Sequence, residues 1–408
     1  MSMPWRIVLR VSIAPRIGVL LLLWLLAYSG NVSELVTDGY WESVTAQTTF
    51  QLVWIAPALA ACGAWEGLRV RQSEVLRGTP VRSQSRVALS ALAPTLALGI
   101  VAVALAFALI APQAAGYPGR PSVGILGLTI LVATAHAVGG YALGLSLPRM
   151  LAVPVAMLGS WVWMAYPAAM SAFWVRQLNG RNLTECCALD QVAAPRSILA
   201  PALVAAGMIA ASWLWAAQRR PYRHLAPAVL AAAVTVSALA VHPLGYRAAE
   251  PRPAALRSCT GTAPRVCLWP EQRAAAVDIT AWATQAVDRL SAAGVRTGRD
   301  VSVKSAAPTR NQVLSLVASS AVPNDIPRCA EKGSWPGGFA LGPISIWLSL
   351  TAGADPGVVS ASFAPDEVRI AEQVRRLPQE AQLAWFQRNA QTLTRCDKEP
   401  DLDPSHYT

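Results

Sequence analysis

The sequence EGLRVRQSEVLRGTPVRSQSR, residues 66–86, is a basic segment between two long apolar ones. It contains five arginines and two glutamates, whereas the flanking runs Ser43–Trp65 and Val87–Gly119 carry no charged residue. A helix needs about 20 apolar residues to cross a bilayer, and both runs reach that length. Short loops rich in Lys and Arg stay in the cytoplasm. Residues 66–86 are therefore predicted to be a cytoplasmic loop between two membrane spans, and this assignment fixes the side of every other segment.

The composition also indicates a membrane protein with several spans. Of 408 residues, 54% are hydrophobic and only 14% are charged, which is more apolar surface than one soluble core could bury. The segments that we assign to the cytoplasm hold 12 Arg and 2 acidic residues, and the rest of the chain holds 22 basic and 21 acidic residues. The net charge of +11 therefore comes from the arginines of the cytoplasmic segments, and no nucleic-acid partner is expected.

The sequence predicts an all-α polytopic membrane protein with a seven-helix transmembrane bundle in residues 17–246, the N-terminus in the cytoplasm and the C-terminus outside. The predicted spans are about 17–33, 43–65, 87–111, 122–147, 151–175, 197–218 and 225–246. Residues 1–16 contain Arg6, Arg10 and Arg16 and no acidic residue. This cytoplasmic segment is expected either to lie at the lipid headgroups or to be a plain charged flank.

Residues 247–408 are predicted to form a small extracytoplasmic domain that is mainly α, with α+β as the alternative. Helices are expected near 270–294, 311–322, 365–377 and 378–396, with a strand at 301–303 and a frayed end after Cys396. Within this domain, Gly333–Ala354 has 22 residues without charge and reaches the length of an eighth span. Its five glycines and two prolines favour a bent segment buried in the domain instead.

The cysteines lie where the predicted topology places an oxidising compartment. Cys62 falls inside a span, and the other six fall on the outer side: Cys186, Cys187, Cys259, Cys267, Cys329 and Cys396. Six thiols allow 15 connectivities. We favour a bond between Cys259 and Cys267, because the loop between them is short, and a second bond between Cys329 and Cys396. The adjacent pair Cys186 and Cys187 is left open between a ring, bonds elsewhere and free thiols. Metal binding is not expected, because no C-x-x-C pattern occurs.

Motifs of catalysis are missing from the sequence. It has four histidines and contains no H-E-x-x-H, G-x-S-x-G or G-x-x-x-x-G-K-[ST] pattern, so no enzyme activity and no cofactor are expected. His136, inside the fourth span, is interpreted as a packed neutral side chain and not as part of an ion pathway. With 31 Arg, 3 Lys and abundant Ala the composition is typical of a GC-rich bacterium, so the sequons at Asn31 and Asn182 are interpreted as fortuitous.

The run LRGTPVRS, residues 76–83, follows a glutamate-containing helical stretch and precedes the third span. It resembles the cytoplasmic loop of ABC-2-type exporter permeases, in which a coupling helix contacts a separate ATPase. Residues 1–16 are similar to the interfacial elbow helix of that family, and the first six spans match its usual number. The resemblance covers residues 1–218, and the whole chain also resembles membrane proteins of actinobacteria.

This resemblance implies a permease-like subunit of an ABC-type transport complex, in the cell membrane, with a separately encoded ATPase and a second permease chain, identical or related, as partners. It implies a coupling loop at Glu74, Arg77, Gly78, Pro80 and Arg82, in which the charged side chains pair with the ATPase and Pro80 ends the helix. The alternative for the loop is that its arginines only anchor it in the cytoplasm.

Two other classes of function remain from the sequence. The first is a membrane sensor or scaffold, whose extracytoplasmic domain binds a ligand or partner and signals through the bundle. The second is a membrane enzyme, which the missing motifs disfavour.

Overall fold

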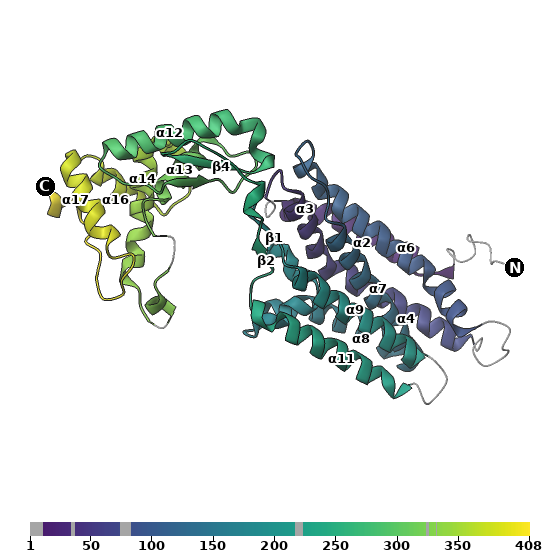
Figure 1. Cartoon of the computed structure of the whole chain (residues 1–408). Helices are drawn as coiled ribbons and strands as arrows, with labels where there is room; N and C mark the ends of the chain where they lie inside the picture. Colours follow the sequence, from purple (N-terminus) through teal and green to yellow (C-terminus); the bar gives the residue numbers. More distant parts are fainter. Residues whose placement is uncertain (1–10, 34–36, 74–82, 217–222, 324–325, 332) are drawn as a thin grey trace. The chain divides into compact units, whose positions relative to one another are not determined.

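The computed structural model describes residues 11–33, 37–73, 83–216, 223–323, 326–331 and 333–408 (Figure 1). The chain divides into two compact units, Met1–Arg252 and Pro253–Thr408. The division lies beyond the predicted boundary at Tyr246, because strand β2 (Ala249–Pro251) pairs in antiparallel register with β1 (Gln191–Ala193) of the first unit.

The first unit is a bundle of helices (Figure 1). Its helices are α2 (Ala14–Ser33), α3 (Trp41–Gln47), η1 (Thr48–Gln51), α4 (Leu52–Gln72), α6 (Gln84–Ile110), η2 (Ala111–Ala114), α7 (Val123–Ser146), α8 (Arg149–Ala165), α9 (Pro195–Ala216), α11 (Leu225–Val241) and η6 (His242–Leu244). Among the described residues, six stretches are long and apolar enough to cross a membrane, namely 41–72, 84–114, 123–146, 149–169, 195–216 and 225–244. A shorter apolar stretch, Ala14–Ser29, lies in α2. The structure thus agrees with the predicted all-α membrane protein.

The second apolar helix is longer than predicted. It continues as α4 through Glu66 to Gln72, so the first residues of the predicted loop 66–86 are helical. Glu66 is fully buried, and its carboxylate accepts a 2.8 Å hydrogen bond from Ser12 Oγ and forms a 2.8 Å ion pair with Arg69. A buried carboxylate needs such partners, since desolvation disfavours its charge. The helix can therefore carry Glu66 into the bundle.

The fifth apolar helix is shorter than predicted. Helix α8 ends at Ala165, and the chain then folds into three 3-10 turns instead of continuing to Val175. These turns are η3 (Tyr166–Ala169), η4 (Phe173–Leu178) and η5 (Arg181–Glu185). Pro167 lacks the N–H that an α-helix requires at that position. The side chain of Asn179 donates instead to the carbonyl oxygen of Trp163 at 3.0 Å and so helps to cap the end of α8.

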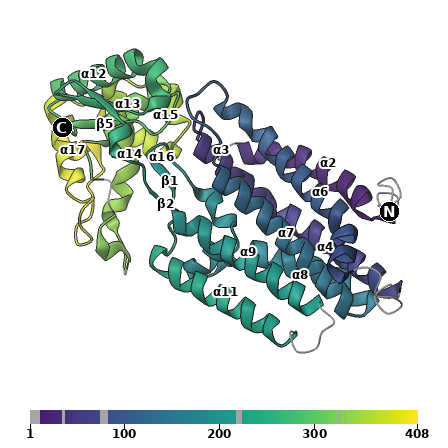
Figure 2. The same cartoon turned by 45° about the vertical axis from the view of Figure 1, so that its right-hand side comes forward.

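Helices α4 and α7 lie side by side (Figure 2). They touch through their backbones along two pairs of glycines. A Cβ added at Gly63 or Gly67 of α4 would overlap backbone carbonyl oxygens of α7, and a Cβ added at Gly140 or Gly144 of α7 would overlap those of α4. Each pair is spaced by four residues, so its members lie on one face of their helix. In an apolar environment, small residues at this spacing let helices approach closely enough for dense packing.

Polar contacts join other helices inside the bundle. The ring Nδ1 of His136 on α7 and the hydroxyl of Ser160 on α8 lie 2.8 Å apart, and both residues are buried. Ser237 of α11 donates to the carbonyl oxygen of Ala200 on α9 at 2.9 Å. The arrangement of His136 agrees with its interpretation as a packed side chain.

Hydrogen bonds join connecting segments at both ends of the bundle. At one end, Gly39 N–H donates to Gln113 O at 2.8 Å, and Gln177 Nε2 donates to Arg247 O at 3.0 Å. At the other end, Arg71 Nη1 donates to Leu147 O at 2.7 Å. The segments joined by the first two hydrogen bonds were predicted to lie on the outer side of the membrane. Those joined by the third were predicted to lie on the cytoplasmic side.

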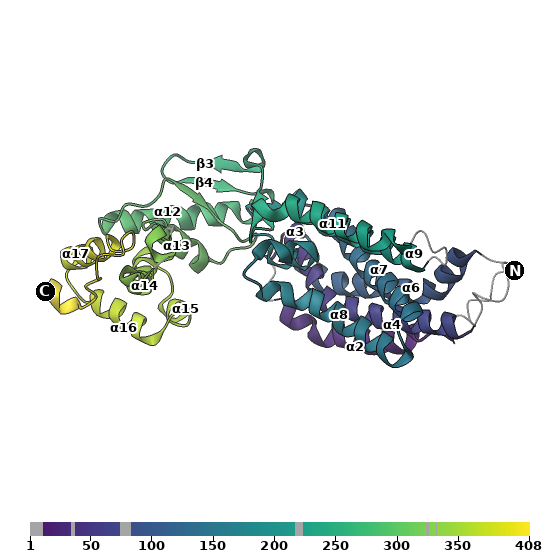
Figure 3. The ribbon, with the colours of Figure 1, turned by 90° about the horizontal axis from the view of Figure 1, so that it is seen from below.

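The second unit combines a small sheet with several helices (Figure 3). The sheet has the order β3 (Ser258–Thr260), β4 (Arg265–Leu268), β5 (Asp300–Ser302), with β3 antiparallel and β5 parallel to β4. The helices are η7 (Ala254–Leu256), η8 (Pro270–Ala275), α12 (Ala276–Ala292), α13 (Arg310–Ser319), η9 (Arg328–Glu331), η10 (Pro336–Ala340), α14 (Leu341–Ala352), α15 (Pro356–Ser360), α16 (Pro365–Val374), α17 (Gln379–Ala390) and η11 (Pro404–Tyr407). This mixture corresponds to the α+β alternative with helices in the majority.

Helix α14 is the centre of the second unit (Figure 3). Its residues Ile344, Trp347 and Leu348 are at most 1% exposed, and they belong to a core that includes residues of the sheet and of α12, α13, α16 and α17. The indole of Trp347 donates to Gln382 Oε1 at 2.9 Å. The later part of the charge-free segment 333–354 is therefore buried in the core of this unit, where the sequence favoured a buried segment.

The prediction of a frayed C-terminus is wrong. Asn389 is fully buried, and its side-chain amide exchanges two 2.8 Å hydrogen bonds with the backbone N–H and carbonyl oxygen of Asp401. His406 Nδ1 lies 2.8 Å from Asp401 Oδ1, and this hydrogen bond raises the pKa of His406 above its ordinary value. The side chain of Asn389 thus fixes the end of the chain to α17. Nothing in the sequence pattern of α17 distinguishes this residue from its neighbours.

Two disulfides lie in the second unit. Cys259 is bonded to Cys267 across β3 and β4, eight residues apart in sequence, and Cys329 is bonded to Cys396, 67 residues apart. These are the two pairs that the sequence favours. The longer bridge ties η9 to the chain after α17.

The backbone contact between α4 and α7 predicts a difference between two glycines of α7. Gly140→Leu should lower the free energy of unfolding of the full-length protein in detergent by about 1–3 kcal/mol or more, because the new side chain must push α4 away. Gly127→Leu is the matched control, since nothing lies within 4 Å of an added Cβ there, and it should change stability by no more than about 0.5 kcal/mol. Equal melting temperatures for the two variants would show that the helices are not in backbone contact.

The two bridges should contribute unequally to stability, because the longer loop restricts the unfolded chain more. Replacing both Cys329 and Cys396 by serine should lower the free energy of unfolding by about 4 kcal/mol, against about 2.5 kcal/mol for the same change at Cys259 and Cys267. Denaturant unfolding followed by tryptophan fluorescence measures both. Thiol labelling of native membranes should modify none of the four, and labelling at any of them would contradict the account.

Candidate functional site

The residues of the predicted coupling loop, Glu74, Arg77, Gly78, Pro80 and Arg82, lie outside the described residues. The structure does describe their flanks, since α4 ends at Gln72 and α6 begins at Gln84. Among the described residues the site must therefore be sought elsewhere in the chain.

A polar segment buried in the bundle is the strongest sign of such a site. The polar residues of α3 and η1 are at most 2% exposed: Ser43, Thr45, Gln47, Thr48, Thr49 and Gln51. Polar side chains in a buried helix are costly unless they find hydrogen-bond partners. Gln47 donates to the carbonyl oxygen of Thr184 at 2.8 Å, and the hydroxyls of Thr49 and Thr184 lie 3.2 Å apart. The loop that contains η5 thus packs on the polar face of α3 and η1.

Local backbone geometry directs this loop into the bundle. Gly180 has φ of 80°, a left-handed conformation that favours glycine, and it separates η4 from η5. Asn179 Oδ1 accepts a 2.9 Å hydrogen bond from the N–H of Arg181 across this glycine. The turn between η4 and η5 is therefore specified by two adjacent residues, Asn179 and Gly180.

A cavity of about 430 Å³, here called the bundle-end pocket, lies between the polar helix and the loop. Its wall includes Thr37, Ser43, Gln47, Phe50, Met164, Arg176, Asn179, Arg181, Asn182, Thr184, Cys186 and Cys187. The volume lies within the range of small-molecule sites, and a mixed wall of apolar and polar groups is typical of them.

Two arginines of the wall are held in place by carbonyl oxygens and aromatic rings. Arg181 lies 4.9 Å from the centroid of the Phe50 ring and donates to the carbonyl oxygen of Met164 at 3.4 Å. Arg176 is 7% exposed, donates to the carbonyl oxygen of Ala168 and lies 4.6 Å from the ring of Tyr246. The contact of Arg181 places positive charge at the C-terminal end of α8, where the helix dipole favours it, and Arg176 binds the following turn η3.

Asn182 supplies a buried donor to the same wall. It is 8% exposed, and its Nδ2 has no hydrogen-bond acceptor among the described atoms. In the sequence, Asn182 is distinguished only as part of a sequon, and its place in the pocket was not predicted. The signal that could have found the pocket is the polar run TAQTTFQ, residues 45–51, inside a predicted span.

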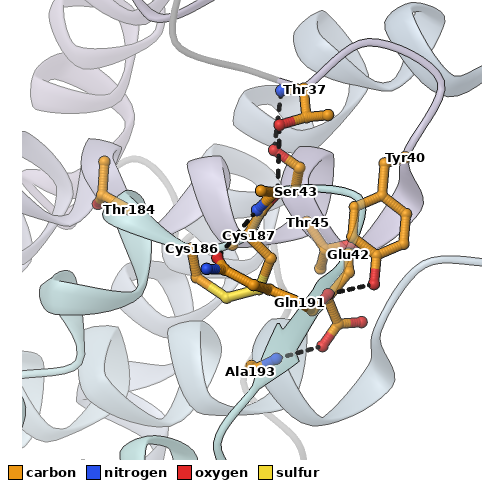
Figure 4. The surroundings of a disulfide bond; sticks show 12 residues. Thr37, Tyr40, Glu42, Ser43, Thr45, Thr184, Cys186, Cys187, Gln191 and Ala193 are labelled. Carbon is orange, nitrogen blue, oxygen red and sulfur yellow. Dashed lines mark hydrogen bonds between the residues drawn. A yellow bond between two sulfur atoms is a disulfide. The ribbon is translucent and has the colours of Figure 1, made fainter. Parts of the chain in front are cut away.

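Cys186 and Cys187 are bonded to each other and line the pocket (Figure 4). Both are at most 3% exposed, and the carbonyl oxygen of Cys187 accepts a 3.2 Å hydrogen bond from Thr37 Oγ1. Of the three states left open by the sequence, the structure shows the ring. The bridge therefore belongs to the pocket wall, whereas Cys259, Cys267, Cys329 and Cys396 lie in the second unit.

Hydrogen bonds from α3 and the residue before it anchor the strand that follows this disulfide (Figure 4). The hydroxyl of Tyr40 donates to the carbonyl oxygen of Gln191 at 2.6 Å, and Glu42 Oε1 accepts from the N–H of Ala193 at 3.4 Å. Arg252 packs on the Tyr40 ring at 4.9 Å from its centroid. Strand β1 is thus fixed to α3 at the edge of the pocket.

The second unit has a groove of its own, with a volume of about 600 Å³. It runs between strand β3 and the start of α12, and its wall includes Leu256, Leu268, Trp269, Arg273, Val277 and Thr280. Val277 is 83% exposed, so an apolar side chain faces solvent there. Nowhere in the described residues do three or more His, Cys, Asp or Glu side chains gather in a way that could hold a metal ion.

Comparisons with known proteins bear on the second unit. Residues 266–396 match the family model "Domain of unknown function (DUF7224)". The match begins in β4, ends at Cys396 and includes α14, so it covers most of the core of this unit. No curated protein and no solved structure matches the chain.

Proposed function

We propose that this protein is the membrane-spanning, permease-like subunit of an ABC-type transport complex that works with a separately encoded ATPase. One observation carries the proposal. The continuous helical stretch Trp41–Gln72 has three residues of the pocket wall, Ser43, Gln47 and Phe50, near one end, and the predicted coupling loop follows directly after its other end. A transport subunit needs a polar site for its cargo and a separate end that receives the ATPase, and this helix connects the two.

The packing of that helix supports a mechanical role. Its α4 portion is in backbone contact with α7 along Gly63 and Gly67, so the two helices are expected to move as one body. A displacement at the end of α4 would then shift the pocket wall against the loop of η4 and η5. No catalytic step within this chain is part of the proposal.

The proposed orientation places the pocket and the second unit outside the cell membrane and the coupling loop in the cytoplasm. The disulfides of the second unit support this side, because such bonds persist in oxidising compartments. The proposed topology has seven spans, with α2 as the first, and a second permease chain, identical or related, completes the complex.

A membrane sensor or scaffold is the second candidate, and the groove of the second unit favours it. An apolar groove with an exposed Val277 and a single cation, Arg273, in its described wall suits a ligand or a partner segment. A histidine kinase or sigma-factor regulator encoded beside this protein, in place of an ATPase, would support that function.

The proposed function predicts that affinity purification of the full-length protein recovers an ABC ATPase. Arg77→Glu or Arg82→Glu should lower the recovery at least about tenfold, which corresponds to about 1.4 kcal/mol, because the charge would repel its partner in the contact. Arg149→Glu is the matched control, since Arg149 is an exposed arginine at the same end of the bundle and outside the loop. Failure to recover any ATPase, or full recovery with both loop variants, would contradict the proposal.

A further inference from the structure

The bundle-end pocket contains a hydrogen-bond donor that calls for an acceptor. Only 8% of the surface of Asn182 is exposed, and its Nδ2 has no hydrogen-bond acceptor among the described atoms. A buried donor without a partner is unfavourable, because it has lost its hydrogen bonds to water. Because Asn182 lines a cavity of about 430 Å³, a molecule in that cavity can supply the missing acceptor.

The charge of the wall selects the kind of acceptor. Arg176 and Arg181 both line the pocket. Their guanidinium groups are already oriented by the carbonyl oxygens of Ala168 and Met164. Guanidinium and amide donors together suit an oxyanion, such as a carboxylate or a phosphate.

The rest of the wall limits the size and shape of the molecule. Phe50 and Met164 give the pocket an apolar side, and about 430 Å³ leaves space for a small organic molecule. A small aromatic or aliphatic body with one oxyanion therefore fits both parts of the wall.

We propose that the bundle-end pocket binds an oxyanion with a small apolar body, with Asn182 donating a hydrogen bond and Arg176 and Arg181 supplying positive charge. The inference rests on the proposed function in one respect, since it makes this molecule the cargo of the complex. The oxyanion belongs either to a soluble molecule or to a lipid headgroup.

Binding is tested on the purified full-length chain in detergent, without ATPase, by calorimetry with benzoate and phenyl phosphate as probes. Both should bind, whereas benzamide, which has the same shape as benzoate and no charge, should bind at least tenfold more weakly. Asn182→Asp keeps the shape of the side chain and replaces the donor by a negative charge, so it should weaken benzoate binding at least tenfold. Asn311→Asp, in the second unit, is the matched control: Asn311 accepts a hydrogen bond from Asp355 N–H through an oxygen that aspartate retains, and benzoate binding should not change.

The variant Asn182→Ala distinguishes a loss of benzoate binding caused by misfolding from one caused by the missing donor. It adds no charge, so it should keep the melting temperature of the wild type. Its affinity for benzoate should lie between those of the wild type and Asn182→Asp. Competition by phosphatidylglycerol in mixed micelles assigns the oxyanion to a lipid headgroup, and competition by soluble oxyanions alone assigns it to a soluble molecule. Wild-type protein that binds neither probe, or Asn182→Asp that binds benzoate like the wild type, would overturn the inference. Since no ATPase is present, such a failure leaves the result of the ATPase purification unaffected.

Discussion

The backbone contact between α4 and α7 is the constraint on which the bundle depends. Lipid and leucine are equally apolar, so packing between helices in a membrane must come from close approach and not from the hydrophobic effect. Glycines at 63 and 67 of α4 and at 140 and 144 of α7 make this approach possible, because a Cβ at any of them would overlap the facing backbone. The alanines Ala60 and Ala64 beside them then pack with Ala156 of α8. The position of α4 fixes in turn the position of the polar segment that precedes it.

The pocket follows from that polar segment. Buried side chains such as Gln47 and Thr49 require hydrogen-bond partners, and Thr184 of the loop after α8 supplies them. The loop can reach them because α8 ends early, at Ala165, two residues before Pro167, and because Gly180 turns the chain. The positive charges and the donor of Asn182 enter the wall with this loop. A membrane helix with a polar end, covered by a folded loop, is thus the physical origin of the proposed binding site.

The sequence was sufficient for features that depend on local pattern, and insufficient for those that depend on distant partners. Charge-free runs located the apolar helices, and short spacing favoured the bridge between Cys259 and Cys267. The helical continuation through Glu66 was not predictable, since its partner Ser12 is 54 residues away. The pocket was missed for the same reason, because Gln47 meets Thr184 across 137 residues. The ordered C-terminus depends on one buried amide, Asn389, which no periodicity marks. The residues of the predicted coupling loop, 74–82, lie outside the described part of the chain.

In the proposed orientation, the pocket and the second unit lie outside the cytoplasm, and the connection between Gln72 and Gln84 lies inside it. Reporter fusions test it most directly. Alkaline phosphatase, which is active only outside the cytoplasm, should be active when fused after Thr408 and inactive when fused after Gln72. A green fluorescent protein that folds only in the cytoplasm should give the opposite pattern. Fluorescence from the fusion after Thr408, or phosphatase activity after Gln72, would contradict the account.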